Sequence, residues 1–252
     1  MTSVTKKGGG LMMDRRPLLE VIAVDEADAR AAEAGGADRI ELVCAMSEGG
    51  LTPSFGIIEQ VVSSVSIPVY VMIRPHSRSF CYNDGDRKAM KKDIHIAREL
   101  GASGIVIGAL TDKGEADLAL LQECLAEAQR LGVTFHRAID ESASLARTLD
   151  AISAFPQIER ILTSGGKSTA LEAANELKEL STRGGERNVS VMAGAGLIID
   201  KIHPFVLHTS VTELHFGSGV RRESSFYSPV DTNLVAKAKQ HLVDAAKVLH
   251  NF

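Results

Sequence analysis

Short runs rich in β-branched residues recur along this chain, and each is followed by a stretch with helical periodicity. The predicted strands are Leu18–Val24, Arg39–Cys44, Pro68–Arg74, Gly104–Leu110, Val133–Ile139, Arg160–Ser164, Val189–Ala193 and Glu213–Gly217. Helical patterns follow, among them Glu26–Ala34, Arg87–Leu100, Ala116–Leu131 and Ser168–Leu180, and a closing helix is capped by Asp231 or Thr232. Strict alternation of strand and helix predicts a parallel sheet covered by helices.

Eight strand–helix units favour closure of the sheet into a single α/β domain, the (β/α)8 or TIM barrel. The length of 252 residues agrees with this fold, which typically occupies about 250 residues. A doubly wound open sheet ranks second, because no G-x-G-x-x-G follows the first strand. We predict a flexible N-terminal extension over residues 1–16 and one barrel domain over residues 17–252.

Composition excludes several classes of partner. A formal net charge of −4 is unlike that of nucleic-acid-binding proteins, and no apolar run reaches the roughly 20 residues of a membrane span. The opening MTSVTKKGGG lacks the apolar segment of a secretion signal. Three widely spaced cysteines form no disulfide framework. We therefore expect a cytoplasmic protein with no nucleic-acid or membrane partner, and its apolar helix faces would allow a homo-oligomer.

Alternation along the predicted strands collects polar side chains inside the barrel. Successive strand residues point to opposite faces, and the face toward the helices should be apolar. With the aliphatic residues outside, the same parity turns five polar residues inward: Glu20, Glu41, Arg74, His136 and His215. These are the candidate catalytic residues.

Two interpretations of this polar set remain open. It could be a structural ionic core in which Arg74 bridges both glutamates. It could instead be a catalytic or ligand-binding site, which we favour because buried charges are costly unless they are paired or used. Two glutamates and two histidines could hold a divalent cation, or act as general acid and base on a small metabolite. Asp140, after His136, could orient it or cap the next helix.

Glycine-rich turns after the last three strands suggest an anion site. Backbone N–H groups in the corresponding loops of many barrels bind phosphate. Thr163-Ser164-Gly165-Gly166 ends the sixth strand, Gly194-Ala195-Gly196 follows the seventh, and Gly217-Ser218-Gly219 follows the eighth. We therefore expect a small phosphorylated or carboxylated ligand near Gly165, Gly194, Gly196, Ser218 and Gly219.

Long motifs along most of the chain point to one family. They are LLEV (18–21), GGADRIEL (35–42), GGLTPS (49–54), MIRP (72–75), FCYNDG (80–85), VTFHRAID (133–140), ILTSGGKS (161–168), MAGAG (192–196) and ELHFGSG (213–219). In these the chain resembles the CutC family of copper-homeostasis proteins. The resemblance implies a (β/α)8 barrel, a cytoplasmic location and a role in copper handling.

The copper ligands that the resemblance implies are only partly present. Family proposals place cysteines at the ends of the first two strands, where this sequence has Ile22 and Val43. Cys44 comes one residue later, and Cys81 lies in the FCYNDG loop. Because Cu(I) prefers soft sulfur ligands, Cys44 and Cys81 are the candidate copper ligands. Cys124 has the mid-helix position of a small buried apolar residue.

Two functional hypotheses follow. The first, implied by the resemblance, is a cytoplasmic copper-homeostasis protein that binds Cu(I) through Cys44 or Cys81. The alternative is a TIM-barrel enzyme, similar to an isomerase, epimerase or lyase, that acts on a small phosphorylated or carboxylated metabolite. The enzyme would depend on Glu20, Glu41, Arg74 and His136 rather than on the cysteines.

Overall fold

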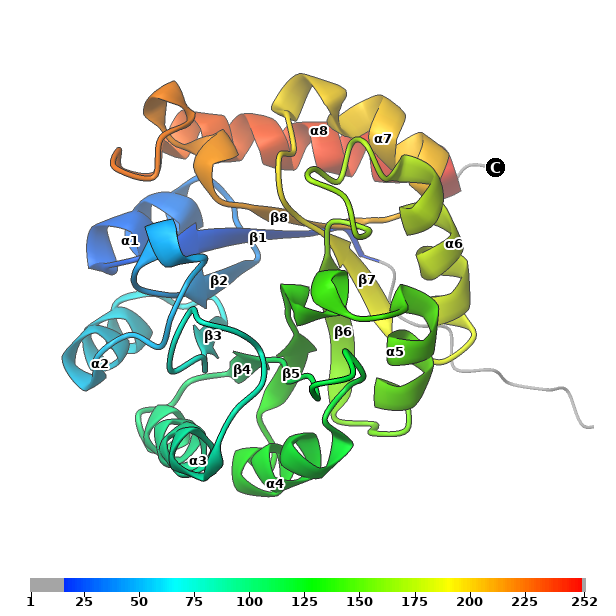
Figure 1. The fold of residues 1–252 in the computed structure, drawn as a ribbon. Helices are drawn as coiled ribbons and strands as arrows, with labels where there is room; N and C mark the ends of the chain where they lie inside the picture. Colours follow the sequence, from blue (N-terminus) through cyan, green and yellow to red (C-terminus); the bar gives the residue numbers. More distant parts are fainter. Residues whose placement is uncertain (1–15, 251–252) are drawn as a thin grey trace, which may run out of the picture.

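The chain forms a closed barrel of eight parallel strands (Figure 1). A computed structural model describes residues 16–250. The strands are β1 (Leu18–Ala23), β2 (Arg39–Leu42), β3 (Val69–Met72), β4 (Gly104–Ile107), β5 (Gly132–Phe135), β6 (Ile158–Thr163), β7 (Ser190–Ala193) and β8 (Glu213–Phe216). They pair in chain order, and β8 closes on β1. This confirms the predicted (β/α)8 barrel.

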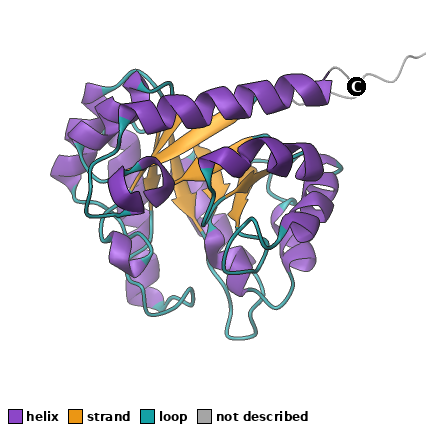
Figure 2. Cartoon of the chain, turned by 90° about the horizontal axis from the view of Figure 1, so that it is seen from above, coloured by secondary structure: helices purple, strands orange, loops and turns teal. Residues whose placement is uncertain are grey.

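Helices surround the barrel on all sides (Figures 1 and 2). They are α1 (Glu26–Ala34), α2 (Phe55–Ser64), α3 (Asp84–Glu99), α4 (Leu118–Ala128), α5 (Leu145–Ile152), α6 (Ala174–Gly185), α7 (Ile202–Thr209) and α8 (Thr232–His250). The α6 helix starts six residues later than the predicted Ser168. Within residues 16–250, every helix is too short or too polar to cross a bilayer. Of the predicted N-terminal extension, residues 1–15 lie outside the described part.

The fifth strand ends earlier than the sequence pattern predicts, and this places a key side chain. β5 stops at Phe135, whereas the prediction extended it to Ile139. His136 instead caps a 3-10 helix over Arg137–Glu141, and its Nδ1 accepts a hydrogen bond from the Ala138 N–H at 3.1 Å. This side-chain bond replaces a strand hydrogen bond and turns the chain across the barrel mouth.

Strand register brings residues that are distant in sequence into contact inside the barrel. Glu20 of β1 lies level with Arg39 of β2 on one side and with His215 of β8 on the other. Glu41 is level with Ile22 of β1 and Tyr70 of β3. Because neighbouring strands at the same level present side chains to the same face, the charged groups of β1, β2 and β8 meet in the interior.

Further charged and aromatic side chains contact one another inside the barrel. The guanidinium carbons of Arg39 and Arg160 lie 4.6 Å and 5.7 Å from the Tyr70 ring centroid. Arg160 also donates to Glu213 at 2.9 Å. Tyr70 has room because glycine stands at 104 and 132 on the facing strands: a Cβ on Gly104 would lie 2.5 Å from the Tyr70 Cζ.

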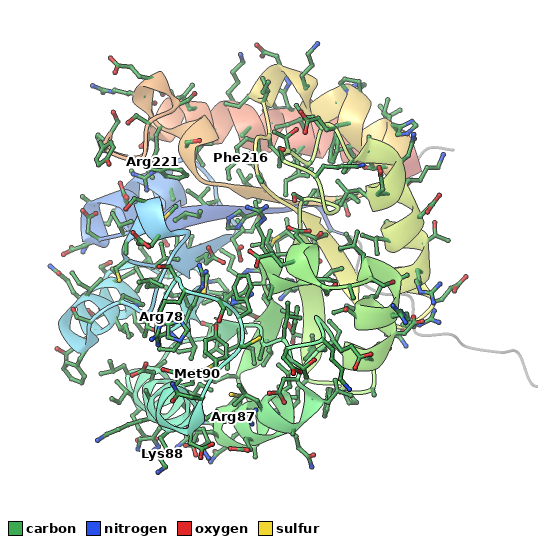
Figure 3. The ribbon with its side chains drawn as sticks, viewed as in Figure 1. Arg78, Arg87, Lys88, Met90, Phe216 and Arg221 are labelled. Carbon is green, nitrogen blue, oxygen red and sulfur yellow. The ribbon has the colours of Figure 1, made fainter. Side chains whose placement is uncertain are left out.

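The loop between β8 and α8 is fixed to α1 by a buried ion pair of Arg221, which Figure 3 labels, with Asp28. Arg221 Nη2 donates to Asp28 at 2.6 Å and to the Ile22 carbonyl at 3.1 Å. Asp28 also accepts from the Val230 N–H at 2.9 Å. Arg221 therefore serves this loop and is not part of an anion site after β8.

Replacing Gly104 with alanine should destabilise the protein. The new Cβ would lie 2.5 Å from the Tyr70 ring and 2.6 Å from the Gly132 carbonyl oxygen, and overpacking of this kind typically costs about 1–3 kcal/mol. Gly56→Ala is the control, because nothing lies within 4 Å of that Cβ and alanine favours the α2 helix by about 0.5–1 kcal/mol. Urea denaturation measures both changes. Equal stabilities for the two variants would contradict the packing described for Tyr70.

Candidate active site

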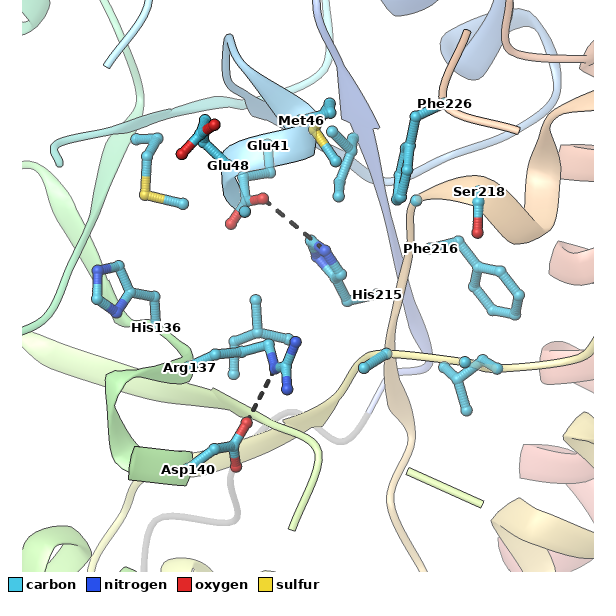
Figure 4. A pocket seen from close by; sticks show the side chains of 18 of the residues that line it. Glu41, Met46, Glu48, His136, Arg137, Asp140, His215, Phe216, Ser218 and Phe226 are labelled. Carbon is cyan, nitrogen blue, oxygen red and sulfur yellow. Dashed lines mark hydrogen bonds and ion pairs between the residues drawn. The ribbon is translucent and has the colours of Figure 1, made fainter. Parts of the chain in front are cut away.

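A cavity of about 500 Å³ opens among the residues at and beyond the C-terminal ends of the strands. Several sequence-predicted residues line it: Glu41, Arg74, His136, His215, Gly196, Ser218 and Gly219. Figure 4 shows Glu41 beside His215, with the His136 ring on the far side of the Glu41 carboxylate. The structure therefore brings four of the five candidate catalytic residues to one cavity.

Glu20, the fifth candidate, lies behind the cavity wall and is 0% exposed. Its Oε2 accepts a hydrogen bond from Arg39 Nε at 2.5 Å, and its Oε1 lies 2.7 Å from His215 Nδ1. Burial alone would raise the pKa of Glu20, but the charge of Arg39 and the bond with His215 outweigh it and lower this pKa to about 2. Glu20 is therefore an ionised group that orients His215.

Glu41 and His215 form a coupled pair at the cavity surface. The Glu41 Oε2 lies 3.8 Å from His215 Nε2, and no side chain or backbone group of residues 16–250 bonds to the Glu41 Oε1. Burial raises the pKa of Glu41 to about 7, against the favourable charge of His215. Burial opposes protonation of His215, but Glu41 and Glu20 together raise its pKa. One proton can therefore move between this pair and a ligand near neutral pH.

His136 is held as a neutral imidazole. Burial and the nearby charge of Arg74 lower its pKa to about 3. Its Nδ1 accepts the Ala138 N–H, so the ring proton resides on Nε2. That Nε2 is buried and lacks a partner among the described residues. In this tautomer His136 can donate a hydrogen bond from Nε2, and its lowered pKa favours a donor over the general base that the sequence suggests.

Arg74 does not bridge the two glutamates, so this part of the structural-core interpretation is wrong. Arg39, whose side chain faces the same side of β2 as that of Glu41, makes the ion pair with Glu20 instead. Arg74 Nη1 donates to the carbonyls of Glu48 and Gly50 at 3.1 Å and 3.3 Å. Within residues 16–250, Arg74 makes no ion pair with a carboxylate, although it is only 8% exposed.

The glycine loops divide into two groups. Gly165 and Gly194 do not line the cavity: the Gly165 N–H donates to Thr163 Oγ1, and the Gly194 N–H donates to the Thr163 carbonyl. Both therefore serve the turn rather than a ligand, contrary to the prediction. Gly196, Ser218 and Gly219 line the wall near β7 and β8, where Figure 4 shows Ser218.

Asp140 occupies the donors of the loop after β6. Its carboxylate accepts from the N–H groups of Ser164 and Gly166 at 3.0 Å and 3.1 Å and from the Thr163 hydroxyl. Arg137 Nε lies 2.9 Å from it. Because a carboxylate of the chain satisfies these donors, this loop is not a ligand site. Asp140 does not cap α5 either, since the Ser144 side chain accepts the Arg147 N–H there.

The cysteines lie apart from the cavity wall. Cys44 is half-buried, its Sγ donates to the Thr52 carbonyl at 3.1 Å, and burial raises the pKa of its thiol. Cys81 is exposed. Ile22, at one family cysteine position, lines the cavity, and Val43, at the other, is buried beside it in an aliphatic cluster. These residues do not form the thiolate site that Cu(I) prefers.

Three side chains at or behind the cavity wall have oxygen or nitrogen atoms close enough to share a cation, and some of these atoms already make hydrogen bonds within the protein. Both Glu20 oxygens make such bonds, one with Arg39 and one with His215. One oxygen or nitrogen of each of Glu20, Glu41 and His215 lies within 4.8 Å of the others. Glu20, Glu41 and His215 therefore form a candidate ligand set for a divalent cation, with the Glu41 carboxylate and His215 Nε2 on the cavity side.

Sequence reasoning missed several residues of the site. Arg39 could have been found, because it is two residues before Glu41 and so faces the same side of β2. Phe80, Phe226 and Met46 also line the cavity. Phe80 and Phe226 come from loops and Met46 from a three-residue 3-10 helix, where no long strand or helix periodicity predicts the direction of a side chain.

Removing the Glu20 charge should destabilise the protein strongly. Glu20→Gln leaves Arg39 and His215 buried without their carboxylate, a change that typically costs about 3–5 kcal/mol. Because the pKa of Glu20 is lowered to about 2 from 4.5, its contribution is complete above pH 4.5 and is lost as the pH falls toward 2. Denaturant unfolding across this range measures it. Glu26→Gln, at an exposed pair with Arg30, should change little; equal effects would contradict the assignment.

Comparisons with known proteins agree with this architecture. A model of the CutC family matches residues 18–220. A CutC family protein of Caulobacter vibrioides is 43% identical over 208 residues, which cover 82% of this chain and 84% of the relative. One of Xylella fastidiosa is 42% identical over 197 residues, covering 78% and 73%.

Solved structures extend the comparison. A CutC from Streptococcus agalactiae, named for copper homeostasis, superposes with a TM-score of 0.74 at 29% identity and covers 80% of this chain and 98% of its own. Phosphoribosyl anthranilate isomerase from Thermotoga maritima superposes with a TM-score of 0.62 at 12% identity, covering 90% and 98%, and shows the fold alone. The family match over most of the barrel and the CutC relatives at more than 40% identity establish that the chain belongs to the CutC family.

Proposed function

We propose that this chain is a barrel enzyme that binds a small anionic metabolite and moves a proton within it, as isomerases, epimerases and lyases do. The observation that carries this proposal is Glu41. Its carboxyl is buried, has one oxygen without a partner among residues 16–250, and lies on the wall of an open cavity beside His215. A structural core residue would have both oxygens bonded.

Glu41 has the properties required of a general base. Its pKa of about 7 lies near physiological pH, where proton transfer in both directions is most efficient. His215 is oriented by Glu20 and presents Nε2 to Glu41. In this role Glu41 takes the proton from the ligand, and the His215 cation stabilises the carboxylate before transfer.

The cavity lining carries charges of both signs, and one unpaired positive charge among them favours an anionic group on the ligand. Arg74 contributes a positive charge that no described carboxylate balances, and His136 contributes a neutral donor. Gly196, Ser218 and Gly219 form the opposite wall. A ligand with one or two acidic groups would satisfy donors that are otherwise left unpaired in a buried site.

Copper binding is the second candidate, and family membership favours it. The soft donors that line the cavity are the thioethers of Met46 and Met72, whereas Cys44 and Cys81 are absent from the lining. Copper handling by this chain would therefore depend on surface thiols or on thioethers rather than on a thiolate cluster. The three free cysteines support a reducing, cytoplasmic location, and we retain the proposal of a homo-oligomer.

Proton transfer by Glu41 is tested by solvent deuterium exchange. Pyruvate and dihydroxyacetone phosphate serve as carboxylated and phosphorylated carbonyl probes, with proton NMR in D2O as the measurement. The exchange rate should rise with pH and level off above the Glu41 pKa of about 7, because only the ionised carboxylate accepts a proton. Glu41→Gln should lower the rate by about 10²- to 10⁴-fold.

Stability and titration provide controls for the same residue. The pKa of Glu41 is raised from 4.5 to about 7 in the folded protein. Between these two pH values the unfolded chain gives up the Glu41 proton more readily than the folded protein does, so the folded protein loses stability as the pH rises. Glu41→Gln should therefore be more stable than the wild type at pH 8, on the order of 1–3 kcal/mol, while being inactive. Carbon-13 NMR of the wild-type carboxyl should show the raised midpoint. A midpoint near 4.5 would contradict the proposal whatever the substrate.

Copper is tested by anaerobic Cu(I) titration of the reduced protein against a competing chelator. We expect weak binding without a single defined site, and Cys44→Ser and Cys81→Ser should each reduce it only in part, since these thiols lie apart from the cavity. Tight binding of one equivalent that either substitution abolishes would overturn this expectation and support a dedicated copper site.

A further inference from the structure

The Arg74 side chain has one edge bonded to the protein and one edge without a protein partner. Nη1 donates to the carbonyls of Glu48 and Gly50. Nε is buried and has no hydrogen-bond partner among residues 16–250. In a side-on pair, a carboxylate binds Nε and Nη2 together, as Asp150 does with Arg183 in this same chain. Arg74 is also one of the residues that line the cavity.

No group of the described chain neutralises this guanidinium. Arg74 forms no ion pair within residues 16–250, while the other deeply buried arginines, Arg39, Arg160 and Arg221, all pair with carboxylates. The Tyr82 hydroxyl interacts with Arg74, yet burial raises the pKa of Tyr82 to about 12, so this group stays uncharged. A buried guanidinium without a counter-charge is costly unless a ligand supplies one.

A second donor lies on the same part of the wall. The Phe80 ring is 4.5 Å from the Arg74 guanidinium carbon and 5.0 Å from the His136 ring, measured to its centroid. Gly108 lets the His136 ring pack tightly, since a Cβ there would lie 2.4 Å from Nδ1. His136 is 3% exposed and its Nε2 is unpartnered. Phe80 thus positions two unsatisfied donors on one wall of the cavity.

We propose that Arg74 and His136 form a carboxylate-binding subsite, so that the substrate of this cavity is a small carboxylic acid. This inference rests on the proposed function and names its substrate class. The side-on edge of Arg74 donates hydrogen bonds to both oxygens of a planar carboxylate, and His136 donates from Nε2 to one of them. A single buried guanidinium beside a neutral imidazole balances one negative charge, which matches a carboxylate better than a phosphate dianion.

Glycolate is the probe for this subsite, because it is a small carboxylate without a carbonyl group and its binding is independent of proton transfer by Glu41. Calorimetric titration should show saturable binding that inorganic phosphate displaces only weakly. Arg74→Lys keeps the positive charge but removes the two parallel N–H donors of the guanidinium. It should weaken glycolate binding at least about tenfold, or about 1.4 kcal/mol. Arg78→Lys is the matched control on the same loop, since Arg78 is 71% exposed (Figure 3). It should bind as the wild type does.

Nitrogen-15 NMR of the wild-type protein provides a test that needs no variant. The Arg74 Nε–H and His136 Nε2–H signals should both shift on addition of glycolate, and His136 should remain the neutral Nε2–H tautomer from roughly pH 5 to pH 8. Absence of glycolate binding, unshifted signals, or equal affinity in Arg74→Lys and Arg78→Lys would overturn the subsite. Tighter binding of phosphate through Arg74 would overturn the carboxylate assignment. If glycolate binds while deuterium exchange fails, the subsite stands and the proton-transfer role falls.

Discussion

The interior of this barrel depends on the two bonds made by Glu20. One oxygen holds Arg39 at 2.5 Å and the other holds His215 at 2.7 Å. The pair with Arg39 keeps Glu20 ionised in a fully buried position, and the ionised carboxylate then orients His215 toward Glu41. Without this arrangement, three buried charges would lack partners, and the base on the cavity wall would lose the cation beside it.

The buried polar atoms on the two sides of this cluster differ in whether they have hydrogen-bond partners. On one side, Arg160 contacts both the Tyr70 ring and the Glu213 carboxylate inside the barrel. On the other side, Glu41 Oε1, Arg74 Nε and His136 Nε2 are all buried without protein partners. Unsatisfied polar atoms are rare in folded proteins. The three residues that carry these atoms all line one cavity at the C-terminal side, where barrel enzymes bind ligands.

The family name and the chemistry of the cavity point in different directions. Relatives are named for copper homeostasis, yet the wall of this cavity presents carboxylates, imidazoles, two guanidiniums and two thioethers, and the thiols lie elsewhere. Ile22 and Val43 make an aliphatic surface where cysteines would be expected. A barrel that combines a raised-pKa carboxyl with an unpaired guanidinium is suited to a small organic acid.

The sequence by itself determined the eight-strand barrel and the inward direction of Glu20, Glu41, Arg74, His136 and His215, because alternation along a strand is a local property. It did not determine which groups these side chains would pair with. Which arginine pairs with Glu20 depends on the register between β1 and β2, and the state of His136 depends on a turn that ends β5 early. Asp140 shows the same limit, since its carboxylate fills the loop after β6 that glycines alone had suggested for a ligand. Such pairings join segments far apart in the chain, and only the closed barrel sets their distances.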